Sequence, residues 1–243
     1  MVLHAGGGYA ENRAWQQQSE WNVFGRDLRP NGNLAADYLD DTFIRAGAAW
    51  EYGPLQLDGE VTWHDFKDTP VLGGQATMRE VNLGGQLDLL DGLGNQWLLR
   101  GSYAGFDGSA PVQMKTWLGD YGSLRGYGAG ILTGDEGAHA SLDTRFGFDL
   151  FKAAKIPLLK NWGLQPIAFM DWGKTWDHEV GLAGPPDPAE GACGWRMDVG
   201  FGFGKRFDVP GLGEFRNVRL YAARPVGEGS DGFGWRVLLA FEK

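Results

Sequence analysis

The residues that most often do enzyme chemistry are sparse in this sequence. Its four histidines are His4, His64, His139 and His178, and none has a nearby serine in a recognisable nucleophile arrangement. Hydrolytic triads are assembled in space rather than in sequence, so a hydrolase stays open as the weakest alternative. We therefore expect a protein that is not an enzyme and has no catalytic residue.

The sequence gives equally little support for a metal site or a nucleotide-binding site. The run Asp177-His178-Glu179 contains metal-binding side chains, but an exposed polar loop explains it more simply. Cys193 is the only cysteine, which excludes an internal disulfide and a cysteine metal cluster. The glycines around Tyr127 look like a dinucleotide-binding loop, but no βαβ unit follows them. We expect neither a metal nor any other cofactor.

One arginine and two aspartates offer a different chemistry, which is ion pairing. The arginine belongs to a tetrad that reads Leu124-Arg125-Gly126-Tyr127. Asp143 and Asp171 follow it in two later segments. A guanidinium can bind carboxylates through two parallel hydrogen bonds, and few other side-chain pairs are as specific. Whether these groups can meet depends on the elements that carry them.

The composition favours a β protein with an aromatic surface. Glycine accounts for 40 of the 243 residues, beside 11 tryptophans and 14 phenylalanines, where an average protein has about 7% glycine. The glycines have no period of three, which excludes collagen, and an aromatic content of 13% argues against disorder. The longest apolar run, residues 237–241, is far below the roughly 20 residues of a spanning helix. The net charge of −9 argues against nucleic-acid binding.

Alternation of apolar and polar residues predicts β-strands along most of the chain. Residues 139–150 and 195–204 show it well, with tryptophans near the ends of the apolar stripes and charges, glycine and serine opposite. A soluble sandwich also alternates. Aromatic residues at both ends of an apolar outer face are typical of a membrane barrel, whose closed sheet satisfies every backbone amide in lipid. We therefore predict an all-β fold, an antiparallel transmembrane β-barrel, with a soluble sandwich as the alternative.

About eleven strands are predicted, separated by connections that alternate between short and long. The strands are 2–10, 15–25, 42–52, 55–66, 79–89, 96–106, 138–150, 163–176, 194–206, 215–225 and 234–243. Short turns of outer-membrane barrels face the periplasm, which places the C-terminus there and residue 1 outside. Such barrels have an even number of strands, so the odd count predicts one barrel domain over 1–243 that is incomplete on its N-terminal side. The alternative is a missed strand within 1–41.

Three segments in a fixed order resemble a known superfamily. The tetrad comes first, then a strand carrying Asp143, then a strand that reads Phe169-x-Asp171-x-Gly173. Together they resemble the BamA/TamA outer-membrane assembly superfamily, also called the bacterial surface antigen family, most strongly over 96–243. The resemblance implies a barrel of sixteen strands with the tetrad in its sixth external loop. These eleven strands would then be the sixth to the sixteenth, with periplasmic POTRA repeats upstream.

Strand parity gives the tetrad a physical role. Asp143 and Asp171 both fall on the polar face of their strands, which faces the interior of a barrel. An external loop folded inward would bring Arg125 to both carboxylates, and a partly dry interior strengthens such a pair. Gly126 would allow close backbone approach, and Tyr127 could pack on the wall. We predict that Arg125 pairs with Asp171 and Asp143 and pins the loop inside. The alternative is a solvated loop arginine.

The last predicted strand begins at Gly234 and alternates Val237, Leu239 and Phe241 on one face. This pattern resembles the C-terminal signal by which assembly machinery engages barrel substrates. Two charged residues follow the final aromatic residue, which departs slightly from that signal. An ordinary last strand is a compatible interpretation.

The resemblance implies a protein of the bacterial outer membrane that inserts or exports polypeptides without hydrolysis. Its expected partners are outer-membrane lipid, lipopolysaccharide, polypeptide clients and POTRA repeats, and no nucleic acid. Two alternatives stay open, a passive pore or surface antigen and the barrel anchor of an upstream hydrolase domain.

Overall fold

The computed structural model describes most of the chain, and most of the described part is β-structure. The described residues are 1–12, 22–23, 26–27, 39–69, 74–108, 114–159, 162–176, 195–206, 217–227, 230 and 232–242. The main sheet contains β1 (Val2–Asn12), β4 (Leu39–Tyr52), β5 (Leu55–Thr69), β6 (Gly74–Leu90), β7 (Gln96–Phe106), β10 (Glu136–Arg145), β11 (Leu164–Trp176), β12 (Arg196–Arg206), β13 (Asn217–Val226) and β14 (Arg236–Glu242). Two small ribbons, β2 (Asn22–Val23) with β3 (Arg26–Asp27) and β8 (Thr116–Leu118) with β9 (Leu132–Gly134), and the helix α1 (Leu150–Ala153) complete it.

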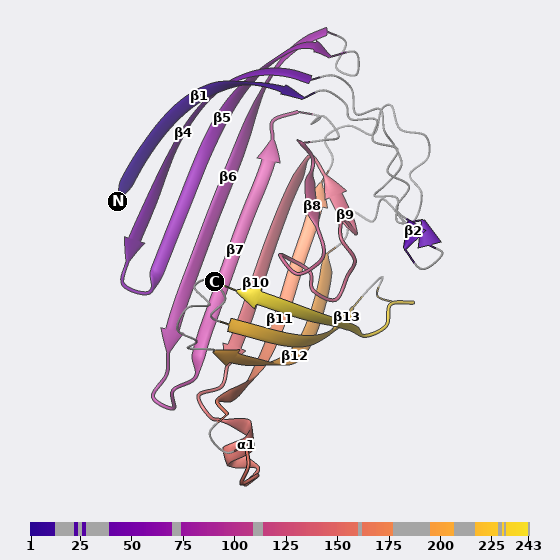
Figure 1. The fold of residues 1–243 in the computed structure, drawn as a ribbon. Helices are drawn as coiled ribbons and strands as arrows, with labels where there is room; N and C mark the ends of the chain where they lie inside the picture. Colours follow the sequence, from indigo (N-terminus) through magenta and orange to yellow (C-terminus); the bar gives the residue numbers. More distant parts are fainter. Residues whose placement is uncertain are drawn as a thin grey trace.

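The ten strands form one antiparallel sheet in which neighbours in the chain are neighbours in space. Its order is β1-β4-β5-β6-β7-β10-β11-β12-β13-β14. The sheet curves strongly, so that β12, β13 and β14 cross in front of β10 and β11 (Figure 1). The right-handed twist of each strand accumulates over so many neighbours and curls the sheet. The predicted all-β antiparallel fold is confirmed.

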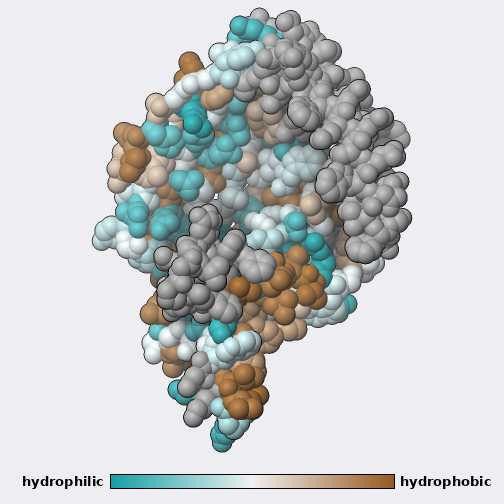
Figure 2. Space-filling model, in the orientation of Figure 1, coloured by the Kyte–Doolittle hydropathy of each residue, from teal (hydrophilic) through white to brown (hydrophobic). Residues whose placement is uncertain are grey.

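The two faces of the sheet are inverted relative to a soluble protein. Large apolar side chains are exposed on the outer face, among them Trp63, Phe201 and Leu239. The inner face instead buries polar residues such as Ser141 and Asp171. Figure 2 shows hydrophilic residues in the hollow of the sheet and hydrophobic residues on its outer rim. The alternation read from the sequence therefore places its apolar stripes outward.

The predicted count of eleven strands is wrong for the main sheet. Strand β1 pairs directly with β4 over eleven residue pairs, from Val2 opposite Ala49 to Asn12 opposite Leu39. The hydrogen-bonding edge of β1 is thereby used, and no strand 15–25 can lie between the two. Most of 15–25 lies outside the described residues, and Asn22–Val23 belongs to the small ribbon with β3.

The corrected count also moves residue 1 to the other end of the sheet. Val2 lies near the tight turn that joins Tyr52 to Leu55, which is the end of the short connections. Glu242 pairs with Asn217 at this same end. The placement of residue 1 on the external side is therefore wrong, and the argument for missing strands from an odd count no longer holds. Five strands, not six, precede the tetrad in the sheet.

Two apolar clusters lie on the inner face and hold the loop against the wall. One joins β11, β13 and β14 through Ile167, Phe169, Tyr221, Ala223 and Ala240. The other lies within the loop and consists of Leu118, Leu124, Tyr127 and Leu132.

Within the described ranges, no helix has both the length and the apolar character needed to cross a membrane.

Candidate functional site: an arginine lock between an inward loop and the wall

The long connection between β7 and β10 folds into the interior as a narrow hairpin loop. The ribbon β8–β9 forms its stem, with Thr116 opposite Gly134. Gly119 and Gly130 lie next to the stem and have positive φ angles of 129° and 67°. Residues with a side chain rarely adopt such angles. A Cβ at Gly119 would also collide with the carbonyl oxygen of Gly128. The glycines therefore let the chain turn tightly enough to present residues 124–127 to the wall.

The tetrad arginine is enclosed by two carboxylates of the wall. Arg125 donates from Nε to Asp171 Oδ2 at 2.8 Å and from Nη2 to Asp171 Oδ1 at 2.7 Å, which makes a two-pronged pair. Its Nη2 also donates to Asp143 Oδ1 at 2.5 Å. All three side chains are buried, and Asp171 is completely inaccessible to solvent. The pairing that the sequence predicts for Arg125 is present in the structure.

Aromatic rings complete the enclosure of the guanidinium. Its Cζ lies 3.6 Å from the centre of the Phe169 ring and 5.3 Å from that of Tyr221. Stacking on a ring face attracts a cation and excludes water from it. Phe169 and Tyr221 themselves meet edge to face at 5.4 Å. Within the Phe-x-Asp-x-Gly motif, Phe169 therefore stacks on the same arginine that Asp171 binds.

The two motif glycines make room for the loop. A Cβ at Gly173 would lie 3.0 Å from Leu118 Cδ1 and 3.2 Å from Leu124 Cδ1, so this wall position must stay small for Leu124 to pack. A Cβ at Gly126 would lie 2.7 Å from the Cβ of Asp198 and 3.0 Å from a backbone nitrogen of β13. Every residue type in the two motifs is therefore explained by a contact between loop and wall.

The fourth tetrad residue anchors the loop to a different part of the wall. Tyr127 is fully buried, and its hydroxyl donates to the carbonyl oxygen of Met197 at 3.3 Å. Its ring meets Phe233 edge to face at 5.2 Å. The tetrad consequently bridges β10 and β11 on one side and β12 with the segment before β14 on the other.

The electrostatics keep the arginine charged. Burial lowers the pKa of the Arg125 guanidinium, but the hydrogen bonds and charges of Asp171 and Asp143 outweigh it and raise the pKa above its ordinary range. A charge held this way depends on both partners, because a buried charge without a partner is strongly unfavourable. The site can therefore act as a latch.

Sequence reasoning missed four polar residues around this latch. Arg100 donates to Asp143 Oδ2 at 2.7 Å, and His139 contacts the Ser123 carbonyl oxygen at 2.9 Å. Asp198 lies directly opposite Asp171 in the pairing of β11 with β12. Their inward parity was visible in the sequence, but the register that brings them to the loop was not.

The fourth missed residue is Arg236, on the last strand. It donates to the carbonyl oxygen of Arg125 and to Asp120 Oδ1, both at 3.3 Å. The predicted C-terminal signal residues lie on the same strand: Val237 and Leu239 are exposed on the outer face, and Gly234 precedes β14. Phe241 belongs to β14, and its side chain is outside the described residues.

The remaining described histidines, His4 and His64, lie away from this site. The run 177–179 and Cys193 lie outside the described residues. His64 is buried elsewhere on the inner face, between Asp41 and Glu80. Within the described ranges, no group of three or more His, Cys, Asp or Glu side chains is arranged to hold a metal ion.

Comparison with solved structures shows the fold. The crystal structure of BamA from Haemophilus ducreyi lacking POTRA domains 1-3 matches with a TM-score of 0.64 and 13% sequence identity. The match covers 99% of this chain and 51% of that chain, so the chain spans about half the length of that BamA structure. Identity this low shows the fold alone, which is that of an outer-membrane β-barrel.

A second solved structure is more distant. OccK5 (OpdH) of Pseudomonas aeruginosa matches with a TM-score of 0.35 and 15% identity, covering 82% of this chain and 47% of that chain. A TM-score this low is not evidence for the fold. No protein-family model matches the chain, and no curated protein matches its sequence.

Proposed function

We propose that this chain is a barrel of the BamA/TamA kind that inserts or exports polypeptides at the bacterial outer membrane and is not an enzyme. The observation that carries the proposal is the latch, in which Arg125 of an inward loop is held by Asp171 and Asp143. The latch joins the three sequence segments that carry the superfamily resemblance. The BamA-like fold supports the same assignment at the level of architecture.

A buried ion pair of this kind is better explained by fixing the position of the loop than by adding stability. Replacing a buried ion pair by well-packed apolar residues is often neutral or stabilising, so such a pair adds little stability for its cost. Its better-attested use is to specify one arrangement of parts. Here the specified arrangement is a loop inside the barrel wall, touching β10, β11, β12 and, through Arg236, β14.

The proposed mechanism uses mechanical parts only. The loop fixes the interior while a weakly paired edge of the sheet and a perturbed bilayer allow polypeptide segments to enter lipid or cross it. Outer-membrane lipid, lipopolysaccharide, polypeptide clients and upstream POTRA repeats are the proposed partners. No cofactor takes part.

The test is folding of a client barrel into vesicles that contain the full chain. We expect the wild-type chain to accelerate insertion of a small unfolded outer-membrane barrel, measured by its heat-modifiable mobility in gels. Arg125→Ala should remove most of this acceleration. Gly128→Ala, in the same loop but with open space around a Cβ, should retain it.

Two outcomes would contradict the proposal. Equal acceleration by wild type and Arg125→Ala would separate the latch from the activity. No acceleration by the wild type, together with stable ion conductance in planar bilayers, would instead favour a passive pore.

A further inference from the structure

We propose that residues 150–159 together with Trp162, which project from the short-connection end of the sheet, are an interfacial anchor that binds the phospholipid surface of the periplasmic leaflet. We call them the short-end anchor. The proposal rests on the membrane placement proposed above. It goes beyond that placement because it gives a lipid contact to a segment outside the strands. In Figure 1 this segment, with α1, projects below the strands.

The short-end anchor is held in a fixed shape. The Asp149 carboxylate accepts hydrogen bonds from the backbone N–H groups of Phe151 at 2.8 Å, Lys152 at 3.1 Å and Gly163 at 2.5 Å. It therefore caps α1 and ties the two ends of the segment together. The Ile156 N–H donates to the Phe151 carbonyl oxygen at 3.0 Å and continues the turn.

The anchor exposes an unusual amount of apolar surface. The side chain of Leu158 is 95% exposed and that of Trp162 is 47% exposed. Ile156 and Leu159 are exposed beside them. Contiguous exposed apolar side chains mark a contact with a membrane or a partner. Figure 2 shows the hydrophobic residues gathered on this projection.

The aromatic part of the anchor is continuous with the outer face of the sheet. Lys205 lies next to Leu164 in the pairing of β11 with β12, on the outer face. Its Nζ lies 4.3 Å from the centre of the Trp162 ring, and Trp162 meets Phe151 at 5.5 Å. Lysine and tryptophan together are typical of the boundary between hydrocarbon and headgroups, because each has an apolar body and a polar tip.

A second lysine and tryptophan pair sets the opposite boundary. Lys174, also on the outer face of β11, lies 5.1 Å from the ring of Trp176 and 5.9 Å from that of Trp195. Leu164 and Lys174 are ten positions apart on the same strand. At about 3.4 Å per residue and a tilt of about 40°, the two pairs are about 26 Å apart along the membrane normal. This equals the apolar band of an outer-membrane barrel, so Trp162 lies at the level of the lipid headgroups.

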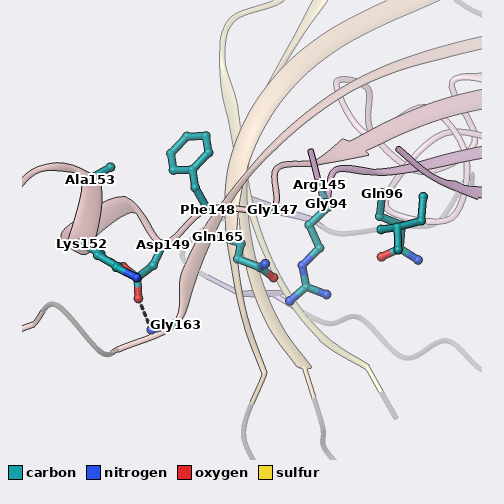
Figure 3. Close-up of a pocket in the computed structure, with 11 residues that line it drawn as sticks. Gly94, Gln96, Arg145, Gly147, Phe148, Asp149, Lys152, Ala153, Gly163 and Gln165 are labelled. Atoms are coloured by element: carbon teal, nitrogen blue, oxygen red, sulfur yellow. Dashed lines mark hydrogen bonds between the residues drawn. The ribbon is translucent and has the colours of Figure 1, made fainter. Parts of the chain in front are cut away.

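The charges of the anchor suit a phosphate-bearing surface. Lys155 and Lys205 are cationic and do not line the inward cavity, while the carboxylate of Asp149 is occupied by backbone N–H groups. The inward side of the same segment lines a cavity of about 920 Å³ with Arg145, Gln96 and Gln165 (Figure 3). Lys152 lines this cavity too, whereas Ile156, Leu158 and Leu159 are not among its lining residues and are left for lipid.

The test places a fluorophore on the most exposed leucine. In a Cys193→Ser background, Leu158→Cys is labelled with the environment-sensitive dye NBD, and the full chain is reconstituted in phosphatidylethanolamine and phosphatidylglycerol vesicles. We expect lipids brominated near the headgroup to quench most of the fluorescence. Lipids brominated deep in the acyl chains should quench much less.

Two further probes separate failure of this inference from failure of the proposed function. Val237→Cys, on the outer face of β14, should be quenched by the deeply brominated lipid, and Ala129→Cys, exposed in the loop, by neither. An unquenched Leu158 probe beside a quenched Val237 probe overturns the anchor alone. Loss of quenching at both positions overturns the membrane barrel. A Leu158 probe shielded only by an added periplasmic protein also overturns the anchor, in favour of protein docking.

The charge contribution is tested separately. Lys155→Glu should weaken quenching of the Leu158 probe in vesicles rich in phosphatidylglycerol, by about five-fold in partitioning for the lost lysine. Vesicles of phosphatidylcholine should show little difference. If the variant and the wild type were quenched equally in the vesicles rich in phosphatidylglycerol, lysine charge would have no role in binding.

Discussion

Two buried clusters on the inner face have the same arrangement of charges but connect different parts of the molecule. In one, the Arg125 guanidinium lies between Asp171 and Asp143. In the other, the Nδ1 of His64 lies 2.8 Å from Asp41 Oδ2 and its Nε2 lies 3.1 Å from Glu80 Oε2. Each places a basic side chain between two carboxylates and covers it with aromatic rings. The centres of the His64 and Phe66 rings, for example, are 5.3 Å apart.

The difference lies in what each cluster holds. The three members of the His64 cluster belong to the adjacent strands β4, β5 and β6, which are already joined by backbone hydrogen bonds. Arg125 belongs to a loop whose tip, among the described residues, is bound to the wall by hydrogen bonds that each involve a side chain, not by a backbone ladder. The same chemistry therefore reinforces a wall in one place and holds a separable segment in the other.

The largest expected effect is loss of the latch. Arg125→Ala leaves Asp171 and Asp143 buried without their cation, so releasing the loop should become easier by about 3–5 kcal/mol. Limited proteolysis of the full chain in vesicles should then cut within 119–130, where the wild type resists. Arg125→Lys should restore little protection, because an ammonium cannot form the two-pronged pair.

A glycine pair within the tetrad loop tests close packing. Gly126→Ala forces a methyl group against Asp198 and the backbone of β13, and overpacking of this kind costs about 1–3 kcal/mol. Gly128→Ala is the matched control, because a Cβ there meets nothing within 4 Å. Thermal release of the loop, followed by proteolysis, should occur earlier for Gly126→Ala alone. Equal behaviour of the two variants would show that the loop does not pack as described.

The wall cluster should respond locally. His64→Gln retains a donor for one carboxylate but cannot reach both. The lost hydrogen bond should lower the free energy of unfolding by about 1 kcal/mol. Hydrogen exchange should increase in β4 to β6 while the loop 119–130 stays protected. Loop exposure in this variant would mean that the two clusters are coupled.

The smallest effect is expected at the edge of the latch. The Arg100 side chain is 45% exposed and pairs with Asp143 on the side away from Arg125. Exposed pairs contribute about 0.2–1 kcal/mol, so Arg100→Ala should leave loop proteolysis nearly unchanged. Release as complete as in Arg125→Ala would assign Arg100 to the latch itself.

The sequence predicted the parts of the site that depend on strand parity. Asp143, Asp171 and Gly173 face inward because side chains alternate along a strand, and this needs no knowledge of neighbouring strands. The direct pairing of β1 with β4 was missed, because a weakly patterned segment of 26 residues between Asn12 and Leu39 could hold either a strand or a loop. Arg236 and Asp198 were missed because their contacts depend on the register of four strands and on the path of the loop.

The contact of Arg236 with the loop has a mechanical consequence. One guanidinium on the final strand holds both the carbonyl oxygen of Arg125 and the carboxylate of Asp120. Because Arg125 is bound to β10 and β11, a pull on the last strand is transmitted through the loop to strands three and four places away in the sheet. The edge strand and the loop therefore share a load, and neither can be displaced far without straining the other.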